Sequence, residues 1–223
     1  IFHDALLQKL PIVYCMDRAG LVGPDGPTHH GVFDIAFMMS LPSMIVSAPK
    51  DGNELYNLLY TAINSNQSFS IRYPKDSSIS YQENCKPKLL EIGKWELLIK
   101  GEKTLLLAIG SMVGMLMKSL NEISESIGYT PTIVNARFIK PLDDILLKQL
   151  CENHHNIITI EEGSLIGGFG SAVSSFLHNN GFNNNLNMMG VPDRFIQHGT
   201  RTELLDSVGL NKKTLISLIK EIN

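Results

Sequence analysis

The stretch "MIVSAPKDGNELYNLLYTAINSNQSFSIRYP", residues 44–74, decides the fold of the first part of the chain. Two short apolar runs rich in β-branched residues, Met44–Pro49 and Phe69–Pro74, predict strands. Between them Asp51 is a good helix N-cap, Glu54 stands at the capping-box position, and leucines recur at helical spacing. A strand–helix–strand order favours parallel strands covered by helices, so the predicted fold class is α/β.

The same alternation extends over the rest of the chain. Upstream, residues 1–10 predict a helix and Ile12–Asp17 a strand. Downstream, the pattern predicts two strands within 95–110 around a Gly101–Glu102 turn, a helix at Met112–Gly128, a strand at Thr132–Ile139, a helix from Pro141 to Asn153 with Asp143 and Asp144 in its first turn, a strand at Asn156–Glu162, a helix at Phe169–Asn180, a strand at Leu186–Pro192 and a closing helix at Asn211–Ile222 capped by Asn211.

Segment 76–92 is polar and has no sustained period, which predicts a linker. We therefore divide the chain into a first unit at 1–80, a linker at 81–92 and a second α/β unit at 93–223. The chain starts at Ile1, inside what looks like a helix without a cap, so we expect it to be the C-terminal part of a longer protein.

Composition excludes several classes of function. A net charge of -3 offers no signal for binding nucleic acid or an anionic membrane, and no apolar run is long enough to span a bilayer. The three cysteines, Cys15, Cys85 and Cys151, are odd in number and widely spaced. We interpret them as reduced thiols of a cytoplasmic protein.

The loop "DRAGLVGPDGPTHHG", Asp17–Gly31, follows the first predicted strand. Ligands of parallel α/β sheets bind at the carboxyl ends of strands, and a loop this long inside a compact unit is more often functional than idle. Arg18 offers a fork suited to phosphate or carboxylate, Asp25 is an acceptor, and His29 is an acid–base group near neutral pH. The alternative is a surface loop in which glycines and prolines only set turns.

Four further patterns bear on possible sites. His29 and His30 lack a third ligand at metal spacing, so we expect no metal site. Arg72 and Lys75 flank a strand end, where we expect them to be exposed; they are either merely solvated or part of the same site. Glycines in 161–171 lack dinucleotide-binding spacing and predict a tight strand-to-helix turn, while His154–His155 predicts a polar helix cap.

Four segments resemble a known family in the same order along the chain. They are "DRAGLVGPDGPTHHGVFD" (17–34), "RYPK" (72–75), "NARFIKPLD" (135–143) and "EEGSLIGGFGSAV" (161–173), and they are similar to the C-terminal half of the 1-deoxy-D-xylulose-5-phosphate synthases. The resemblance implies the end of a pyrimidine-binding parallel-sheet domain followed by a transketolase C-terminal α/β domain.

The resemblance also implies an activity. The family joins pyruvate to D-glyceraldehyde 3-phosphate with loss of carbon dioxide, at the start of the non-mevalonate isoprenoid pathway, using thiamine diphosphate and Mg²⁺ in a cytoplasmic homodimer. By this resemblance His29 is the catalytic histidine, Asp25 lies beside the substrate and Arg18 holds the phosphate. Lys75 stands where the family usually has a second arginine, so we assign it to the substrate as well. His30 stands where many members carry glutamine, so we give it no catalytic role.

The family's catalytic glutamate and its diphosphate- and Mg²⁺-binding motif would lie before Ile1. We therefore assign no cofactor-binding or metal-binding residue, and we expect chain 1–223 alone to be inactive. Two alternatives stay open: a β-type subunit of a 2-oxo-acid dehydrogenase, and a non-catalytic assembly module. The pair Arg18 and Lys75 favours the synthase, because its acceptor substrate is phosphorylated.

Overall fold

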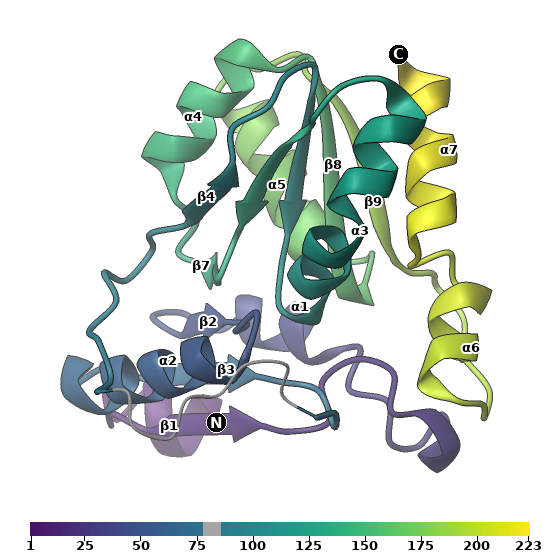
Figure 1. Cartoon of the computed structure of the whole chain (residues 1–223). Coiled ribbons are helices and arrows are strands. Elements are labelled where there is room, and N and C mark those ends of the chain that lie inside the picture. The colour runs from purple at the N-terminus through teal and green to yellow at the C-terminus, as the bar shows by residue number, and fades with distance from the viewer. Residues whose placement is uncertain (78–85) are drawn as a thin grey trace.

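The computed structural model describes residues 1–77 and 86–223, which form two stacked α/β units (Figure 1). The first unit contains a π-helix η1 (Phe2–Leu6), β1 (Val13–Met16), a 3₁₀ helix η2 (Gly23–Asp25), α1 (Asp34–Met39), β2 (Ile45–Ser47), α2 (Gly52–Ser65) and β3 (Phe69–Arg72). The second contains β4 (Glu96–Ile99), β5 (Thr104–Ala108), α3 (Ser111–Ile127), β6 (Thr132–Asn135), β7 (Phe138–Lys140), α4 (Asp144–Asn153), β8 (Asn156–Ser164), α5 (Phe169–Asn179), β9 (Asn185–Val191), α6 (Arg201–Ser207) and α7 (Lys212–Ile222).

The first sheet has the order β1-β3-β2-β7, and its first three strands are parallel, as the strand–helix–strand pattern predicts. Asp51 caps α2 by accepting a hydrogen bond from the Glu54 N–H at 2.8 Å. The capping-box prediction for Glu54 is wrong. The Glu54 carboxylate instead accepts a hydrogen bond from the Lys50 N–H at 2.7 Å. It is buried, and the Arg137 guanidinium of the second unit lies 3.2 Å from it.

The second sheet has the order β4-β6-β5-β8-β9, parallel except for β4. Successive residues of its central strands face opposite ways, so each strand supplies both faces. Leu106 and Ile158 pack with the helices α3 and α7, whereas Leu105 and Ile157 pack with α4 and α5. Helices therefore cover both faces of a largely parallel sheet, as expected for this fold class.

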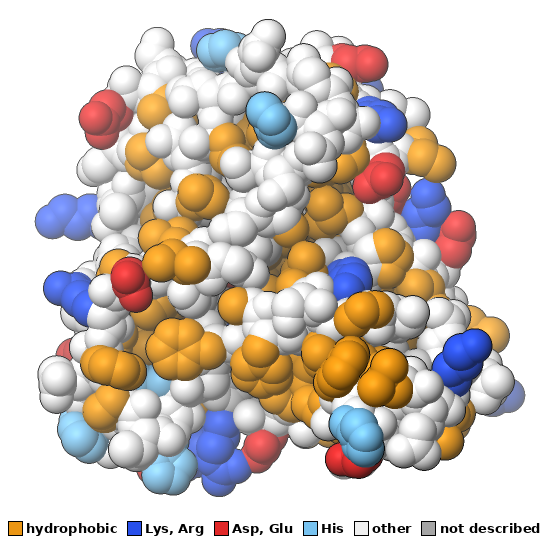
Figure 2. Space-filling model, turned by 180° about the vertical axis from the view of Figure 1, so that it is seen from behind, with side chains coloured by type: hydrophobic (Ala, Val, Ile, Leu, Met, Phe, Trp, Pro, Cys, Tyr) orange, Lys and Arg blue, Asp and Glu red, His pale blue; other side chains and the backbone are white. Residues whose placement is uncertain are grey.

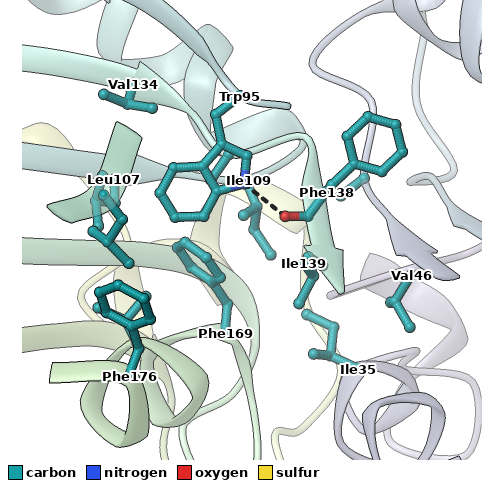
Figure 3. Close-up of a cluster of buried hydrophobic side chains, with 14 of the residues drawn as sticks. Ile35, Val46, Trp95, Leu107, Ile109, Val134, Phe138, Ile139, Phe169 and Phe176 are labelled. Carbon is teal, nitrogen blue, oxygen red and sulfur yellow. Dashed lines mark hydrogen bonds between the residues drawn. The ribbon is translucent and has the colours of Figure 1, made fainter. Parts of the chain in front are cut away.

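One apolar core joins the two units (Figure 3). It includes Ile35 and Val46 of the first unit together with Leu107 and Phe169 of the second. The buried indole N–H of Trp95 donates to the Phe138 carbonyl at 2.7 Å, so its one polar group is satisfied inside this core. The shared core sets the position of the second unit over the first.

Two sequence predictions are wrong in detail. The strand expected at Thr132–Ile139 is two strands, and β7 leaves the second sheet to pair antiparallel with β2. Pro141 precedes α4, which begins at Asp144 with Asp143 as its N-cap.

The remaining predicted helices and strands are present with ends shifted by at most a few residues. The predicted linker falls partly on residues 78–85, outside the described residues, and residues 86–92 contain neither helix nor strand. Cys15 and Cys151 are free thiols as predicted, and Cys85 lies outside the described part of the chain.

Candidate functional site

The loop 17–31 is closed at its base by two backbone hydrogen bonds. Gly20 N–H donates to the Gly31 carbonyl at 2.7 Å, and Gly31 N–H donates back at 2.9 Å. Glycine is needed at Gly31, because an added Cβ would lie 2.4 Å from the Arg18 carbonyl oxygen. The closed base holds the polar residues of the loop together at the carboxyl end of β1.

All four predicted site residues gather in one place. The Lys75 ammonium donates to the Asp25 carboxylate at 2.9 Å, although the two residues are far apart in sequence. This hydrogen bond lowers the pKa of Asp25; burial opposes it, and the charges of Lys75, His29 and Arg18 add to the lowering. One solvent-facing cluster therefore holds a carboxylate, a guanidinium, an amine and an imidazole.

Within this cluster, His29 and Arg18 are accessible. The His29 ring lies 2.9 Å from the Thr28 hydroxyl, and the Arg18 guanidinium, about half exposed, pairs with the neighbouring Asp17. The Arg18 backbone has a φ of 60°, in the left-handed region that non-glycine residues seldom adopt. Accessible cations beside an acid–base group suit a small anionic substrate.

The expectation that Arg72 is exposed is wrong. Only 5% of its surface is exposed, and it donates to Asp34 at 2.7 Å and to the Glu162 carbonyl at 2.9 Å. β3 lies between β1 and β2, and the end of β8 packs against its carboxyl end, where the Glu162 carbonyl accepts from Arg72. Burial lowers the pKa of the Arg72 guanidinium, but Asp34, Glu162 and Glu161 together hold it above its ordinary value. Arg72 is therefore part of the interior, and Lys75 is the cation that faces solvent.

The other predicted histidines and the glycine-rich turn have structural roles. His30 Nδ1 accepts from the Val22 N–H at 3.1 Å inside the loop, and His154 caps α4 by donating to the Leu150 carbonyl at 2.9 Å, as the polar-cap prediction requires. The segment 161–171 is the predicted strand-to-helix turn. Its buried Glu161 accepts from the first N–H groups of α5, at Phe169 and Gly170, both at 2.8 Å.

Glu161 gives a pH-dependent prediction. Burial raises the pKa of Glu161 to about 7, against the lowering effect of the two backbone N–H groups and Arg72. In the unfolded chain the pKa of a glutamate is roughly 4.3. Between this pKa and the folded-state pKa, Glu161 keeps a proton in the folded state that it has released in the unfolded state. We expect stability to fall as pH rises from about 4.5 to 7, by up to about 3 kcal/mol from this group.

Thermal unfolding of the wild type and of Glu161→Gln across this pH range tests the prediction. The variant should show a flatter pH profile between pH 4.5 and 7, and equal slopes in the two proteins would contradict it. Glu203→Gln is the control, because the pKa of that exposed carboxyl is lowered by hydrogen bonds from Thr200 and it does not titrate in this window.

Residues of the second unit that the sequence did not single out also reach the loop. Arg201 pairs with Glu162 and with Asp76, and the His198 ring packs against Gly26 at the tip of the loop. The signal that could have identified α6 was present, since Thr200 and Glu203 form a capping box. Sequence pattern could not show that this helix faces the loop.

A cavity of about 400 Å³ lies next to this cluster, between the starts of α2 and α3 and the helix α6. Asp76 and Arg201 line it, but none of the four predicted site residues does.

No group of three or more His, Cys, Asp or Glu side chains among the described residues could hold a metal ion. No helix among these residues is long and apolar enough to cross a membrane.

Comparisons with known proteins show which domain families and relatives the chain matches. Residues 1–78 match the transketolase pyrimidine-binding domain family and residues 93–215 match the transketolase C-terminal domain family. The 1-deoxy-D-xylulose-5-phosphate synthases of Aquifex aeolicus and Dictyoglomus turgidum are 40% and 43% identical to the chain over 221 and 226 residues. These matches cover 99% and 100% of the chain but 35% and 36% of the relatives, so the chain spans about a third of their length.

Solved structures show the same fold. A split-gene transketolase, described as an inactive β4 tetramer, superimposes with a TM-score of 0.81 at 25% identity, over 94% of this chain and 66% of that one. The transketolase of Campylobacter jejuni superimposes with a TM-score of 0.69 at 19% identity, over 96% of this chain and 32% of that one.

Proposed function

The chain belongs to the transketolase family, and from this we propose that it forms the acceptor-substrate part of a thiamine-diphosphate-dependent 1-deoxy-D-xylulose-5-phosphate synthase. The reaction joins pyruvate to D-glyceraldehyde 3-phosphate and releases carbon dioxide. It supplies the first intermediate of non-mevalonate isoprenoid synthesis and a precursor for thiamine. The observation that carries the proposal is the convergence of Arg18, Lys75 and His29 around Asp25.

These residues suit a phosphorylated aldehyde. The planar guanidinium of Arg18 can bind two phosphate oxygens at once, and Lys75 adds a point charge without a fixed geometry. Because Lys75 already pairs with Asp25, an incoming phosphate shares or replaces that partner. Together, Arg18 and Lys75 favour an aldehyde substrate that carries a dianionic phosphate over an unphosphorylated aldehyde.

His29 acts at the other end of the acceptor. Carbon–carbon bond formation turns the aldehyde oxygen into an alkoxide, which needs a proton. An accessible imidazole can deliver that proton near neutral pH, and Asp25 beside it orients the substrate hydroxyl. Thiamine diphosphate, when bound, supplies the electron sink for decarboxylation of pyruvate.

The described residues do not fit the diphosphate end of the cofactor, because they offer no cluster that could hold Mg²⁺. We place Mg²⁺ and the cofactor's diphosphate on another part of the longer protein, and no step here passes through them. We also propose a cytoplasmic homodimer. Hydrophobic side chains gather in a band across one face (Figure 2), which such a contact would cover. Phe33, Phe37 and Phe195 are among the large exposed apolar residues of the chain.

The phosphate role is tested by Arg18→Ala in the complete enzyme. We expect KM for D-glyceraldehyde 3-phosphate to rise by about tenfold or more, because the charge-assisted contacts to phosphate are lost, while KM for pyruvate changes little. Lys75→Ala should have a smaller effect of the same kind, and Lys75→Arg, which restores a fork, should be tolerated. Equal loss with unphosphorylated glyceraldehyde would exclude the phosphate role and favour the dehydrogenase or assembly alternatives.

A further inference from the structure

The carboxylate of Glu162, at the end of β8, joins three separate elements. One oxygen accepts from the Leu21 N–H of the loop 17–31 at 2.8 Å. The other accepts from the Ser111 hydroxyl at the start of α3 at 2.9 Å and from the Arg201 guanidinium at the start of α6. The side chain is 3% exposed, so these three donors replace water completely.

The loop is shaped to receive this carboxylate. Gly20 has a φ of +80°, and a Cβ on it would lie 2.4 Å from the carboxyl carbon of Glu162, so only glycine lets the two approach. The same strand end also holds the far side of the loop. The Ser164 N–H donates to the Val32 carbonyl at 2.8 Å, and Arg72 bridges the Glu162 and Gly31 carbonyls at 2.9 and 3.3 Å.

We propose that Glu162 is a positioning residue for the acceptor site, through which the C-terminal domain holds the loop that carries Arg18, Asp25 and His29. Without this carboxylate, the Leu21 N–H and the Arg201 guanidinium lose an acceptor in a buried place, which costs more than a hydrogen bond at the surface. The loop then samples positions in which its cations no longer converge. The expected change in KM rests on the function proposed above, whereas the expected loosening of the loop does not.

Two variants and a matched control separate positioning from stability. Glu162→Ala removes all three contacts, whereas Glu162→Gln keeps an oxygen for Leu21 and loses the ion pair with Arg201. Glu54→Ala is the control, because Glu54 is an equally buried carboxylate, 4% exposed, that joins the two units through Asn135 and Arg137. Its partners among the described residues lie outside the loop.

The first readout is amide hydrogen exchange in the full-length protein, which needs no activity. We expect Glu162→Ala to speed amide exchange at Leu21 and through residues 20–31 by about tenfold or more, and Glu162→Gln to speed it less. Glu54→Ala should leave exchange in the loop unchanged, even if it lowers the Tm as much as Glu162→Ala does. Unchanged protection of the loop in Glu162→Ala overturns the proposal, as does equal loss of protection in Glu54→Ala.

The second readout is steady-state kinetics with pyruvate and D-glyceraldehyde 3-phosphate. We expect Glu162→Ala to raise KM for the aldehyde by about tenfold with KM for pyruvate within about twofold, and Glu162→Gln to recover part of the loss. Equal increases in both KM values overturn the positioning role. A wild type without synthase activity would instead refute the proposed function, and the exchange experiment would still decide whether Glu162 holds the loop.

Discussion

Replacing His29 by alanine in the complete enzyme is expected to lower kcat by on the order of 10²-fold or more, the usual loss for a positioned acid–base group. Water can still protonate the alkoxide, but it is not held at the required place. The Tm should hardly change, because His29 is an exposed loop residue whose ring hydrogen-bonds to the neighbouring Thr28 hydroxyl and buries little surface. Single-turnover and steady-state rates with both substrates measure this effect.

His30→Gln is the control for this experiment. The neighbouring His30 accepts from the Val22 N–H, and a glutamine oxygen can keep that contact, so kcat should stay within a few-fold of the wild type. A His29→Ala enzyme with a wild-type kcat would remove His29 from the chemistry. A loss of similar size in His30→Gln would show instead that the loop as a whole, not one imidazole, is required.

Arg72→Met is expected to cause the largest loss of stability, about 3–5 kcal/mol, because it leaves a buried carboxylate without its partner. One oxygen of Asp34 pairs with Arg72, and the other has no hydrogen-bond partner among the described residues. The change also removes the donor shared by the Gly31 and Glu162 carbonyls. Calorimetry should show a Tm lower by roughly 6–20 °C for a chain of this size.

The double variant Asp34→Leu, Arg72→Met tests the cause of that loss. Replacing both charges removes the unpaired carboxylate, so the double variant should be more stable than Arg72→Met, although it still lacks donors for the two carbonyls. If the stability losses of Asp34→Leu and Arg72→Met simply add up in the double variant, the ion pair is not what Arg72 contributes to stability. A fall of less than about 1 kcal/mol in Arg72→Met would show that its burial is not energetically important.

The sequence by itself determined most of the local structure. Period-two and period-3.6 apolar patterns predict the strands and helices well, and Asp51 and Asn211 cap the helices as expected. These signals work because each depends on residues within a few positions of one another. The loop 17–31 was identified as a candidate site for the same reason, since its length and composition are visible locally; the roles of its residues stay predictions that came with the family resemblance.

Only the tertiary structure decided which charged groups meet. Residues 132–139 look like one strand because no glycine or proline interrupts them, yet the backbone leaves one sheet for the other after Asn135. Arg72 looks like an exposed strand-end cation, but the end of β8 covers it. Glu162 binds Leu21 across 141 positions of sequence, a distance at which local pattern carries no information. The partner of a buried charge depends on which strand ends the packing of the two units brings together, and that is a property of the assembled core.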